Sequence, residues 1–338
     1  MADGMAAFVW RGGHDVAVEE VPRPAGGDGW AVVDVAYAGI CGTDLHICAG
    51  EHPRAEAPLV LGHEFVGRLT RDAGGLAAGQ PVAVEPLLNC GHCTPCRTGR
   101  SHVCEQLRLI GIDVPGGVAE QVRVPESRLI ALPDDVELHA AAFVEPLAVT
   151  VHAVRRSGLR LGDTVMVAGA GPIGLGVAAC ARLAGAGEIF VSEPSAARRS
   201  VAEELGFTLL DPEDPGADLS ERTRGELAAV VFDTAGHPAV AAGLASWTTV
   251  GGRIVFVGVY GKPTALDLQD IVFRELDAVG CRVYERADME TAVAMIATGR
   301  FDPSPLITGT VALADAPAAL DRLRSGEDLK VLIDAGAR

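Results

Sequence analysis

The segment DTVMVAGAGPIGLG, residues 163–176, constrains the fold more than any other part of the chain. It places Gly169, Gly171 and Gly174 as G-x-G-x-x-G directly after a Val-rich run and at the start of a helical pattern. The first two glycines allow a tight turn and let backbone N–H groups approach a pyrophosphate, and the third lets helix and strand pack closely. The helix N-terminus, with Pro172 and Ile173, then faces the phosphates with its partial positive charge. These five residues are candidate dinucleotide-binding residues.

The segments around this motif predict a parallel sheet. Strand-like runs (DTVMVAG, EIFVSE, LAAVVFDTAG, GRIVFVGV) alternate with helical patterns, as in βαβ units. The first third instead alternates short β-type runs with Gly and Pro turns, which predicts a small antiparallel or barrel-like domain. The last ~50 residues return to a helix, a turn and short strands. We therefore expect an α/β domain, residues 150–284, inserted into a β-rich domain of residues 1–149 and 285–338.

The second predicted strand of the α/β domain, EIFVSE, ends in Glu193, nineteen residues after Gly174. A carboxylate there can bind the ribose hydroxyls of NAD and would repel a 2′-phosphate, so NAD is favoured over NADP. Arg198, with the neighbouring Arg199, is a candidate cofactor-binding cation, so NADP stays as the alternative cofactor. The alternative for both arginines is an exposed helix face.

Four of the eight cysteines lie in the segment NCGHCTPCRTGRSHVC, within a lobe of residues 89–105. Their spacing is C-x2-C-x2-C-x7-C, with Gly and Pro supplying turns. Four thiolates complete a tetrahedral zinc shell with no open position, so this site is structural. Free or disulfide-bonded cysteines are the alternative, which a reducing compartment disfavours. The predicted ligands of this zinc are Cys90, Cys93, Cys96 and Cys104.

A second candidate metal site comes from GICGTDLHI and LGHEFVG. Cys41 offers a thiolate, His63 an imidazole and Glu64 a carboxylate, and three such ligands with an open position suit a catalytic zinc. Taken alone, Cys41 would be interpreted as a buried thiol, and the adjacent His63 and Glu64 as a pair of surface residues. The cysteine lobe and the dinucleotide motif that follow in order favour the metal site.

Charge and hydropathy exclude several classes of partner. The formal net charge of −17 argues against nucleic acid and anionic membranes as partners, because both bind clustered Lys and Arg. The N-terminal segment does not resemble a signal peptide, and no apolar run approaches the ~18–20 residues that a membrane span needs. The sequence therefore predicts a cytoplasmic protein.

In their order, GHEFVG, the four-cysteine lobe and GAGPIG make the chain resemble the zinc-dependent medium-chain alcohol dehydrogenases over nearly its whole length. The resemblance implies a GroES-like catalytic domain interrupted by a Rossmann domain. It also implies that Cys41, His63 and Glu64 form the catalytic zinc shell. The segment FVEPLAVTVHA, which contains Glu145, resembles the branch of sorbitol, 2,3-butanediol and threonine dehydrogenases. In that branch, Glu145 would contact the zinc or hold its water. Whether Glu64 and Glu145 bind together or exchange is open.

The resemblance assigns roles to three further residues. Thr43 and His46, in CGTDLH, would form a proton relay: Thr43 receives the substrate hydroxyl proton and passes it through the nicotinamide ribose to His46 and solvent. Lys330, in SGEDLKVLI, would reach the cofactor pyrophosphate, and a surface lysine is the alternative.

The expected function is hydride transfer between a secondary alcohol or polyol, or its ketone, and NAD(H), with one catalytic and one structural zinc per chain. A retired dehydrogenase that binds a nucleotide or zinc as a regulatory protein is the alternative. The resemblance also implies a homo-oligomer, tetramer ahead of dimer. No motif separates secondary alcohols, vicinal diols, polyols and amino alcohols as substrates.

Overall fold

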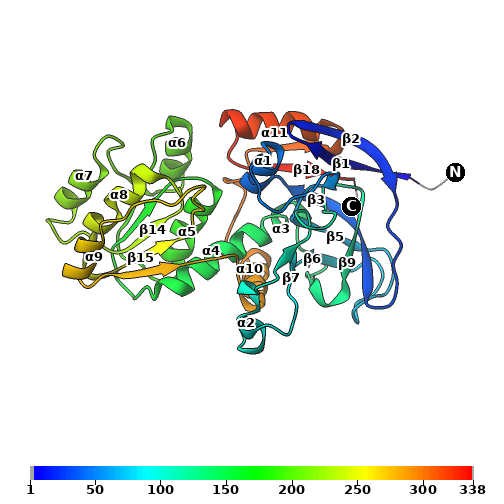
Figure 1. The fold of residues 1–338 in the computed structure, drawn as a ribbon, viewed down its shortest axis with the longest axis horizontal. Coiled ribbons are helices and arrows are strands. Elements are labelled where there is room, and N and C mark those ends of the chain that lie inside the picture. The colour runs from blue at the N-terminus through cyan, green and yellow to red at the C-terminus, as the bar shows by residue number, and fades with distance from the viewer. Residues whose placement is uncertain (1–3, 337–338) are drawn as a thin grey trace. The chain divides into compact units, whose positions relative to one another are not determined.

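A computed structural model describes residues 4–336 and divides the chain into two compact units (Figure 1). Unit 1 comprises the chain up to Glu145 together with the chain from Glu285 onward, and unit 2 is Pro146–Tyr284. The sequence placed the first boundary after residue 149. Helix α4, Val144–Ser157, runs through both positions.

Unit 1 is built on three sheets whose strands pair antiparallel, except that β17 and β18 are parallel. The largest has the order β10-β6-β5-β3-β18-β17, with β9 also paired to β3, and the smaller ones are β2-β1-β4 and β7-β8. The strands are β1 Gly4–Gly12, β2 Asp15–Pro22, β3 Trp30–Gly39, β4 Leu59–Val60, β5 Glu64–Leu69, β6 Pro81–Val84, β7 Leu87–Leu88, β8 Arg108–Leu109, β9 Gln121–Pro125, β10 Leu129–Ala131, β17 Gly309–Ala312 and β18 Val331–Asp334. The helices are α1 Gly42–Cys48, α2 Thr94–Arg97, α3 Leu138–Ala141, α10 Arg286–Ala297 and α11 Ala316–Ser325.

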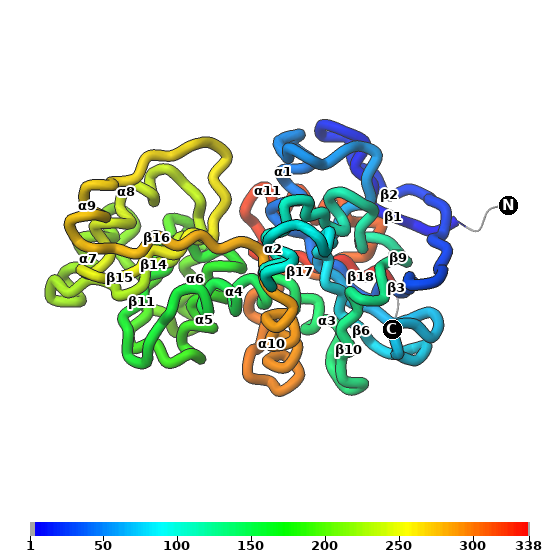
Figure 2. Tube along the Cα trace, turned by 60° about the horizontal axis from the view of Figure 1, so that its bottom comes forward, coloured from blue at the N-terminus to red at the C-terminus, as the bar shows by residue number. Residues whose placement is uncertain are grey.

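Strand β18 ties the end of the chain to its beginning. It pairs antiparallel with β3, with Leu332 opposite Gly39 and Asp334 opposite Tyr37. The colours of Figures 1 and 2 follow the chain from the blue strands of unit 1 through the green and yellow of unit 2 and back to the red β18 beside β3. Unit 2 is therefore an insertion between two parts of one β-rich unit.

Unit 2 carries a six-stranded parallel sheet of order β13-β12-β11-β14-β15-β16, the doubly wound topology that the alternating pattern predicted. Its helices begin at proline or polar positions, where the lost N–H or a side-chain cap suits a helix start. The strands are β11 Val165–Ala168, β12 Ile189–Ser192, β13 Thr208–Leu209, β14 Ala228–Asp233, β15 Thr248–Phe256 and β16 Asp277–Gly280. The helices besides α4 are α5 Pro172–Leu183, α6 Ala196–Glu204, α7 Pro215–Arg222, α8 Pro238–Trp247 and α9 Leu268–Phe273.

The central strands β11, β12 and β14 of the parallel sheet are buried on both faces, which explains their Val-rich sequences. All four residues of β11 are buried, and Met166 from this strand belongs to a core that includes Leu219, Leu244 and Ile254. This core holds the sheet on which the glycine motif is mounted. Among the described residues, no helix is long and apolar enough to cross a membrane.

Replacement of Leu244 by Ala should lower the free energy of unfolding of unit 2 by about 2–5 kcal/mol, because it removes a fully buried side chain from this core. Leu183→Ala, at an exposed position of α5, is the matched control. Chemical denaturation followed by circular dichroism measures both. Equal shifts in the two variants would contradict the assignment of this core.

Candidate metal centres and dinucleotide site

Cys41, His63 and Glu64 come together in unit 1. One donor atom from each lies within 4.8 Å of the others, and both His63 and Glu64 are buried. Antiparallel pairing of β3 with β5 creates this approach, because Gly39 at the end of β3 lies opposite Glu64. A Cβ atom on Gly39 would lie 2.2 Å from Glu64 Oε2, so this position requires glycine. The two motifs that the sequence separated by more than twenty residues therefore form one donor set.

Buried negative charge surrounds these donors. Asp44 is fully buried, its Oδ2 accepts the Cys41 backbone N–H at 2.8 Å, and its Oδ1 lies 4.0 Å from His63 Nδ1. Burial raises the pKa of the Asp44 carboxyl. Burial would lower the pKa of His63, but Cys41, Asp44 and Glu145 outweigh it and raise that pKa well above its usual value. The local charge therefore favours a bound cation.

Two orphaned atoms support the same conclusion. Within residues 4–336, Asp44 Oδ1 and His63 Nδ1 are buried without a hydrogen-bond partner. Buried polar atoms normally have a partner, and a metal-ligating histidine normally directs its other ring N–H toward a carboxylate, as His63 Nδ1 faces Asp44 Oδ1. A thiolate, an imidazole and a carboxylate are the ligand types of a catalytic zinc. The residues present fit a zinc ion.

Lys330 contacts this donor set. Its ammonium group pairs with Glu64 Oε2 and donates to the Ile40 carbonyl at 3.0 Å, and the side chain is buried. Burial disfavours the ammonium, but Glu64 outweighs it and raises the pKa of Lys330. The alternative of a surface lysine is therefore wrong. A contact of Lys330 with a cofactor pyrophosphate stays a prediction.

Glu145 lies near the donor set without joining it. Its side chain is buried at the start of α4, and its charge helps to raise the pKa of His63. Among the described residues, the three donors that lie within 4.8 Å of one another are those of Cys41, His63 and Glu64. Ligation by Glu145, with Glu64 or in exchange with it, stays a prediction.

Thr43 and His46 lie about one turn apart on the short helix α1. Thr43 Oγ1 is 3.8 Å from Cys41 Sγ, next to the donor set. His46 is exposed, and its Nδ1 lies 2.9 Å from Glu51 Oε2. Glu51 and Asp44 were not predicted from the sequence, although Asp44 lies in the same CGTDLH segment as Cys41. Thr43 therefore lies beside the donor set, and His46 lies at the solvent-exposed surface.

The four lobe cysteines form a second donor cluster, with their sulfur atoms within 4.8 Å of one another. Backbone N–H groups point at these sulfurs: Cys90 N lies 3.3 Å from Cys104 Sγ, and Cys93 N lies 3.4 Å from Cys90 Sγ. The backbone N–H of Cys96 contributes most to lowering the pKa of Cys93 to about 6, so a thiolate is available at neutral pH. Four thiolates complete a tetrahedral shell, and the cluster fits a structural zinc ion.

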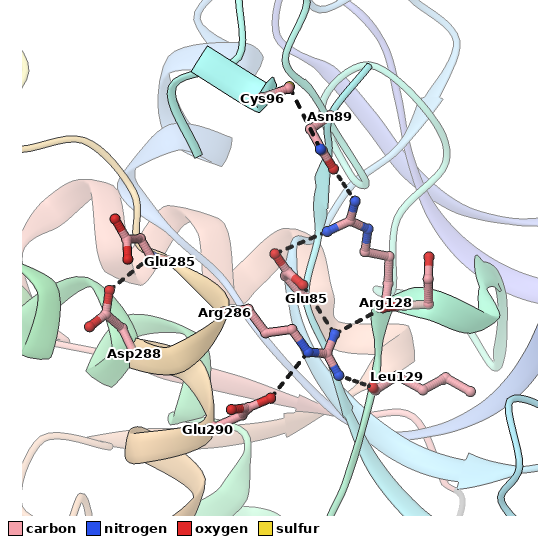
Figure 3. Close-up of polar contacts among 10 residues, drawn as sticks. Glu85, Asn89, Cys96, Arg128, Leu129, Glu285, Arg286, Asp288 and Glu290 are labelled. Atoms are coloured by element: carbon pink, nitrogen blue, oxygen red, sulfur yellow. Dashed lines mark hydrogen bonds and ion pairs between the residues drawn. The ribbon is translucent and has the colours of Figure 1, made fainter. Parts of the chain in front are cut away.

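A chain of polar contacts connects this cluster to helix α10 (Figure 3). Buried Glu85 forms an ion pair with Arg128 Nη1 at 3.1 Å and accepts a hydrogen bond from Arg286 Nη1 at 3.3 Å. Arg128 also binds Asn89 Oδ1, and Asn89 Nδ2 lies 3.7 Å from Cys96 Sγ. Arginine only donates, so the Asn89 oxygen faces Arg128 and its amide N–H groups face the sulfur. Arg286 is the first residue of α10, which links the lobe to the segment that re-enters unit 1.

The glycine motif forms the turn that its sequence predicts. Gly169 follows β11 with φ +109, and Gly171 is the N-cap of α5, with Pro172 and Ile173 in its first turn. Orphan N–H groups at this helix start suit a pyrophosphate. A Cβ on Gly174 would lie 2.0 Å from the Gly169 carbonyl oxygen, so helix and strand pack as closely as the motif requires. The residues present fit a dinucleotide.

Glu193 lies directly beside this turn. Its buried carboxylate accepts the backbone N–H of Ala170 at 2.8 Å and of Ser195 at 2.9 Å. Arg198 Nη1 is 4.0 Å from Glu193 Oε2. Arg199 donates instead to the backbone carbonyls of Glu193 and Leu210. The carboxylate is therefore fixed at the end of β12, next to the phosphate-binding turn.

The chain matches two family models in the expected order. Residues 27–134 match the alcohol dehydrogenase GroES-like domain, and residues 172–298 match the zinc-binding dehydrogenase domain.

Curated relatives and solved structures cover nearly the whole chain. It is 38% identical to 2-dehydro-3-deoxy-L-galactonate 5-dehydrogenase of Pseudoalteromonas atlantica over 90% of this chain and 91% of that protein. It is 34% identical to (R,R)-butanediol dehydrogenase of Bacillus subtilis over 92% and 93%. A protein of Sinorhizobium meliloti described as a zinc-binding dehydrogenase, crystallised with NADP, superposes with a TM-score of 0.92 at 32% identity, covering 98% and 99%.

Two donor clusters predict two zinc ions per chain in the purified protein. Cys41→Ser should remove one ion and leave the thermal stability nearly unchanged, because the unit 1 sheets do not depend on that ion. Cys93→Ser should remove the other and lower the melting temperature, because the lobe has little apolar surface of its own. Mass spectrometry of bound metals and thermal unfolding measure these effects.

The matched control is Cys281→Ser, at a half-buried thiol of unit 2 that belongs to neither cluster. It should keep both ions. Retention of two ions by Cys41→Ser would contradict the catalytic donor set, and a Cys93→Ser protein with two ions and unchanged melting would contradict the structural one.

Proposed function

Because the chain belongs to the zinc-dependent medium-chain alcohol dehydrogenase family, we propose that it uses zinc and NAD to interconvert a secondary alcohol and its ketone. The observation that carries this proposal is the buried donor set of Cys41, His63 and Glu64, whose surroundings favour a cation. A retired dehydrogenase would have no need to keep this donor set together with the glycine motif. The retained chemistry therefore supports an enzyme.

The substrate class that we propose is a secondary alcohol beside another hydroxylated carbon, as in a polyol or a sugar acid. One relative is named for oxidation at position 5 of a deoxygalactonate, and another for butanediol. Both names describe secondary alcohols on short, oxygen-rich carbon chains. Thr43 offers a hydroxyl group near the metal donors, which suits a polar substrate.

We propose that Cys41, His63 and Glu64 hold the catalytic zinc with Glu145 as a further ligand or as the partner of its water. Zinc bound there supplies Lewis-acid chemistry, which lowers the pKa of a substrate hydroxyl and polarises a ketone. Asp44 orients this donor set by accepting the Cys41 N–H and by lying beside His63. Lys330 balances the charge of Glu64. The four lobe cysteines hold the structural zinc.

The proton released from the substrate hydroxyl leaves along α1 in this proposal. Thr43, next to Cys41, would accept this proton while its own hydroxyl proton passes through the nicotinamide ribose to His46 and solvent. His46 is exposed and lies against the Glu51 carboxylate, so its ring is held while it exchanges protons with solvent. Glu51 thereby extends the relay that the sequence predicted.

We propose NAD as the cofactor, bound by the glycine motif, Pro172 and Ile173 at the phosphates and by Glu193 at the ribose hydroxyls. The buried carboxylate of Glu193 would repel a 2′-phosphate. Arg198 lies on the same carboxylate and would support ribose binding rather than compete with it. The S. meliloti structure carries NADP, so the preference needs a direct test.

We propose a homo-oligomer, tetramer ahead of dimer, in the cytoplasm. Strand β16 is an edge of the unit 2 sheet, and Phe273, at the end of the preceding helix α9, is 75% exposed. An open sheet edge and an exposed aromatic side chain support self-association. None of the eight cysteines, which all lie within residues 4–336, is in a disulfide, which supports a reducing compartment.

The proposed function predicts NADH formation from NAD with polyols, sugar acids or vicinal diols, and loss of that activity on treatment with a zinc chelator. Cys41→Ser and His63→Ala should each lower turnover by about a thousandfold or more, because the metal supplies several kcal/mol of charge stabilisation. Absorbance at the NADH band measures turnover, with Cys281→Ser as the control. Chelator-resistant activity, or activity that survives in both metal-site variants, would contradict the proposal.

Glu193→Gln should move the ratio of kcat/KM for NAD to that for NADP toward NADP by roughly tenfold to a hundredfold, since a charged hydrogen bond contributes about 1.5–3 kcal/mol. The amide keeps an oxygen for one backbone N–H, which protects the turn itself. Steady-state kinetics with each cofactor measure the ratio. An unchanged ratio, or an increased preference for NAD, would contradict the role of this carboxylate.

A further inference from the structure

Three loops meet at the carboxyl edge of the unit 2 sheet: the glycine turn after β11, residues 234–237 after β14 and residues 257–261 after β15. The strand order reverses between β11 and β14, where doubly wound sheets bind dinucleotides. Glu193 lies at the end of β12, on the adenosine side of this point. The nicotinamide half of NAD, if the proposed function holds, therefore lies over the loops that follow β14 and β15.

The first two loops are joined through Thr234. Its hydroxyl lies 2.9 Å from the Ala168 carbonyl oxygen and 3.2 Å from that of Gly169. A Cβ on Gly174 would lie 2.7 Å from the same hydroxyl. Thr234 thus packs against the base of the phosphate-binding turn and fixes the start of the loop after β14.

The loops after β14 and β15 touch through their backbones. A Cβ on Gly258 would lie 2.3 Å from the Gly236 nitrogen, and a Cβ on Gly236 would lie 2.8 Å from the Val259 carbonyl oxygen. Gly236 also has φ +60, in the left-handed region. Side chains are therefore excluded from this contact. The backbone N–H groups of Val257 and Gly258 donate to the Asp233 carbonyl at 2.9 and 2.8 Å, which holds the start of the loop after β15 and leaves residues 259–261 to a further interaction.

Asp233 and Tyr260 supply that interaction. The Asp233 carboxylate is fully buried, and its Oδ1 accepts the backbone N–H groups of Ala235 at 3.1 Å and Gly236 at 3.0 Å. Its Oδ2 accepts the Tyr260 hydroxyl at 2.5 Å. Burial and this carboxylate raise the pKa of Tyr260, so the hydroxyl stays a donor. One carboxylate thus organises the loop after β14 with one oxygen and holds the loop after β15 with the other.

We propose that Tyr260 is a positioning residue for the nicotinamide half of NAD, because its bond to Asp233 fixes residues 257–261 against residues 234–237. This inference rests on the proposed cofactor. The hydroxyl is the side-chain anchor of a loop whose Val259 is otherwise exposed to solvent. Without it, Asp233 Oδ2 loses its tyrosine donor and the loop is held by backbone contacts alone. The adenosine half, bound by Glu193 and the glycine turn, does not depend on this bond.

The test compares Tyr260→Phe with wild type, and uses Tyr37→Phe in strand β3 of unit 1 as the matched control. Fluorescence titration gives the Kd of NADH, and calorimetry gives the Kd of ADP-ribose, which lacks the nicotinamide. Tyr260→Phe should weaken NADH roughly tenfold and lower kcat, while the Kd of ADP-ribose stays within about twofold and the melting temperature is nearly unchanged. Tyr37→Phe should leave both dissociation constants unchanged.

Equal weakening of NADH and ADP-ribose would overturn the inference, because it would show that the bond stabilises unit 2 as a whole. Unchanged NADH binding in Tyr260→Phe would also overturn it. Failure of the wild-type protein to bind either ligand would instead overturn the proposed cofactor, and this inference with it.

Discussion

The buried negative charge around Cys41, His63 and Glu64 is the feature on which the candidate catalytic site depends. Asp44 and Glu64 are carboxylates in an apolar interior, where an uncompensated charge is costly. Lys330, brought in by β18, compensates Glu64, and Gly39 leaves the space in which they meet. The remaining charge raises the pKa of His63, so the site attracts either a proton or a metal ion. A bound zinc ion satisfies the same requirement and supplies the chemistry.

The two metal sites differ in what surrounds them. The four lobe cysteines supply all the ligands of a tetrahedral zinc site. Neighbouring side chains connect them to the rest of unit 1, because Asn89 donates toward Cys96 and binds Arg128. Glu85 in turn pairs with both Arg128 and Arg286 of α10. Those contacts stabilise structure. Around Cys41, His63 and Glu64, the neighbours instead adjust charge and orient the donors, and these three donors would leave the fourth position of a tetrahedral zinc shell open.

Local motifs allowed the sequence to predict much of this arrangement. The glycine turn and the four-cysteine lobe each depend on residues close together in the chain, so the spacing of those residues was enough to predict the local geometry. The parallel sheet followed from the alternation of patterns, and its strand order agrees with the family fold. The pairing of Lys330 with Glu64 spans 266 positions, and that of Tyr260 with Asp233 spans 27. Neither has a local signal, because each depends on which strands become neighbours. The burial of Lys330 was likewise set by the β18–β3 pairing rather than by its polar surroundings in the sequence.

The central claim is that the buried donor set of unit 1 binds zinc as a catalytic ligand shell. Anomalous diffraction at the zinc absorption edge, on crystals of the purified protein, tests it most directly because it locates each ion. The account predicts two peaks, one among the four lobe cysteines and one bounded by Cys41, His63 and Glu64. A single peak at the lobe, with Lys330 still paired to Glu64 and no density at the second donor set in zinc-replete crystals, would contradict it.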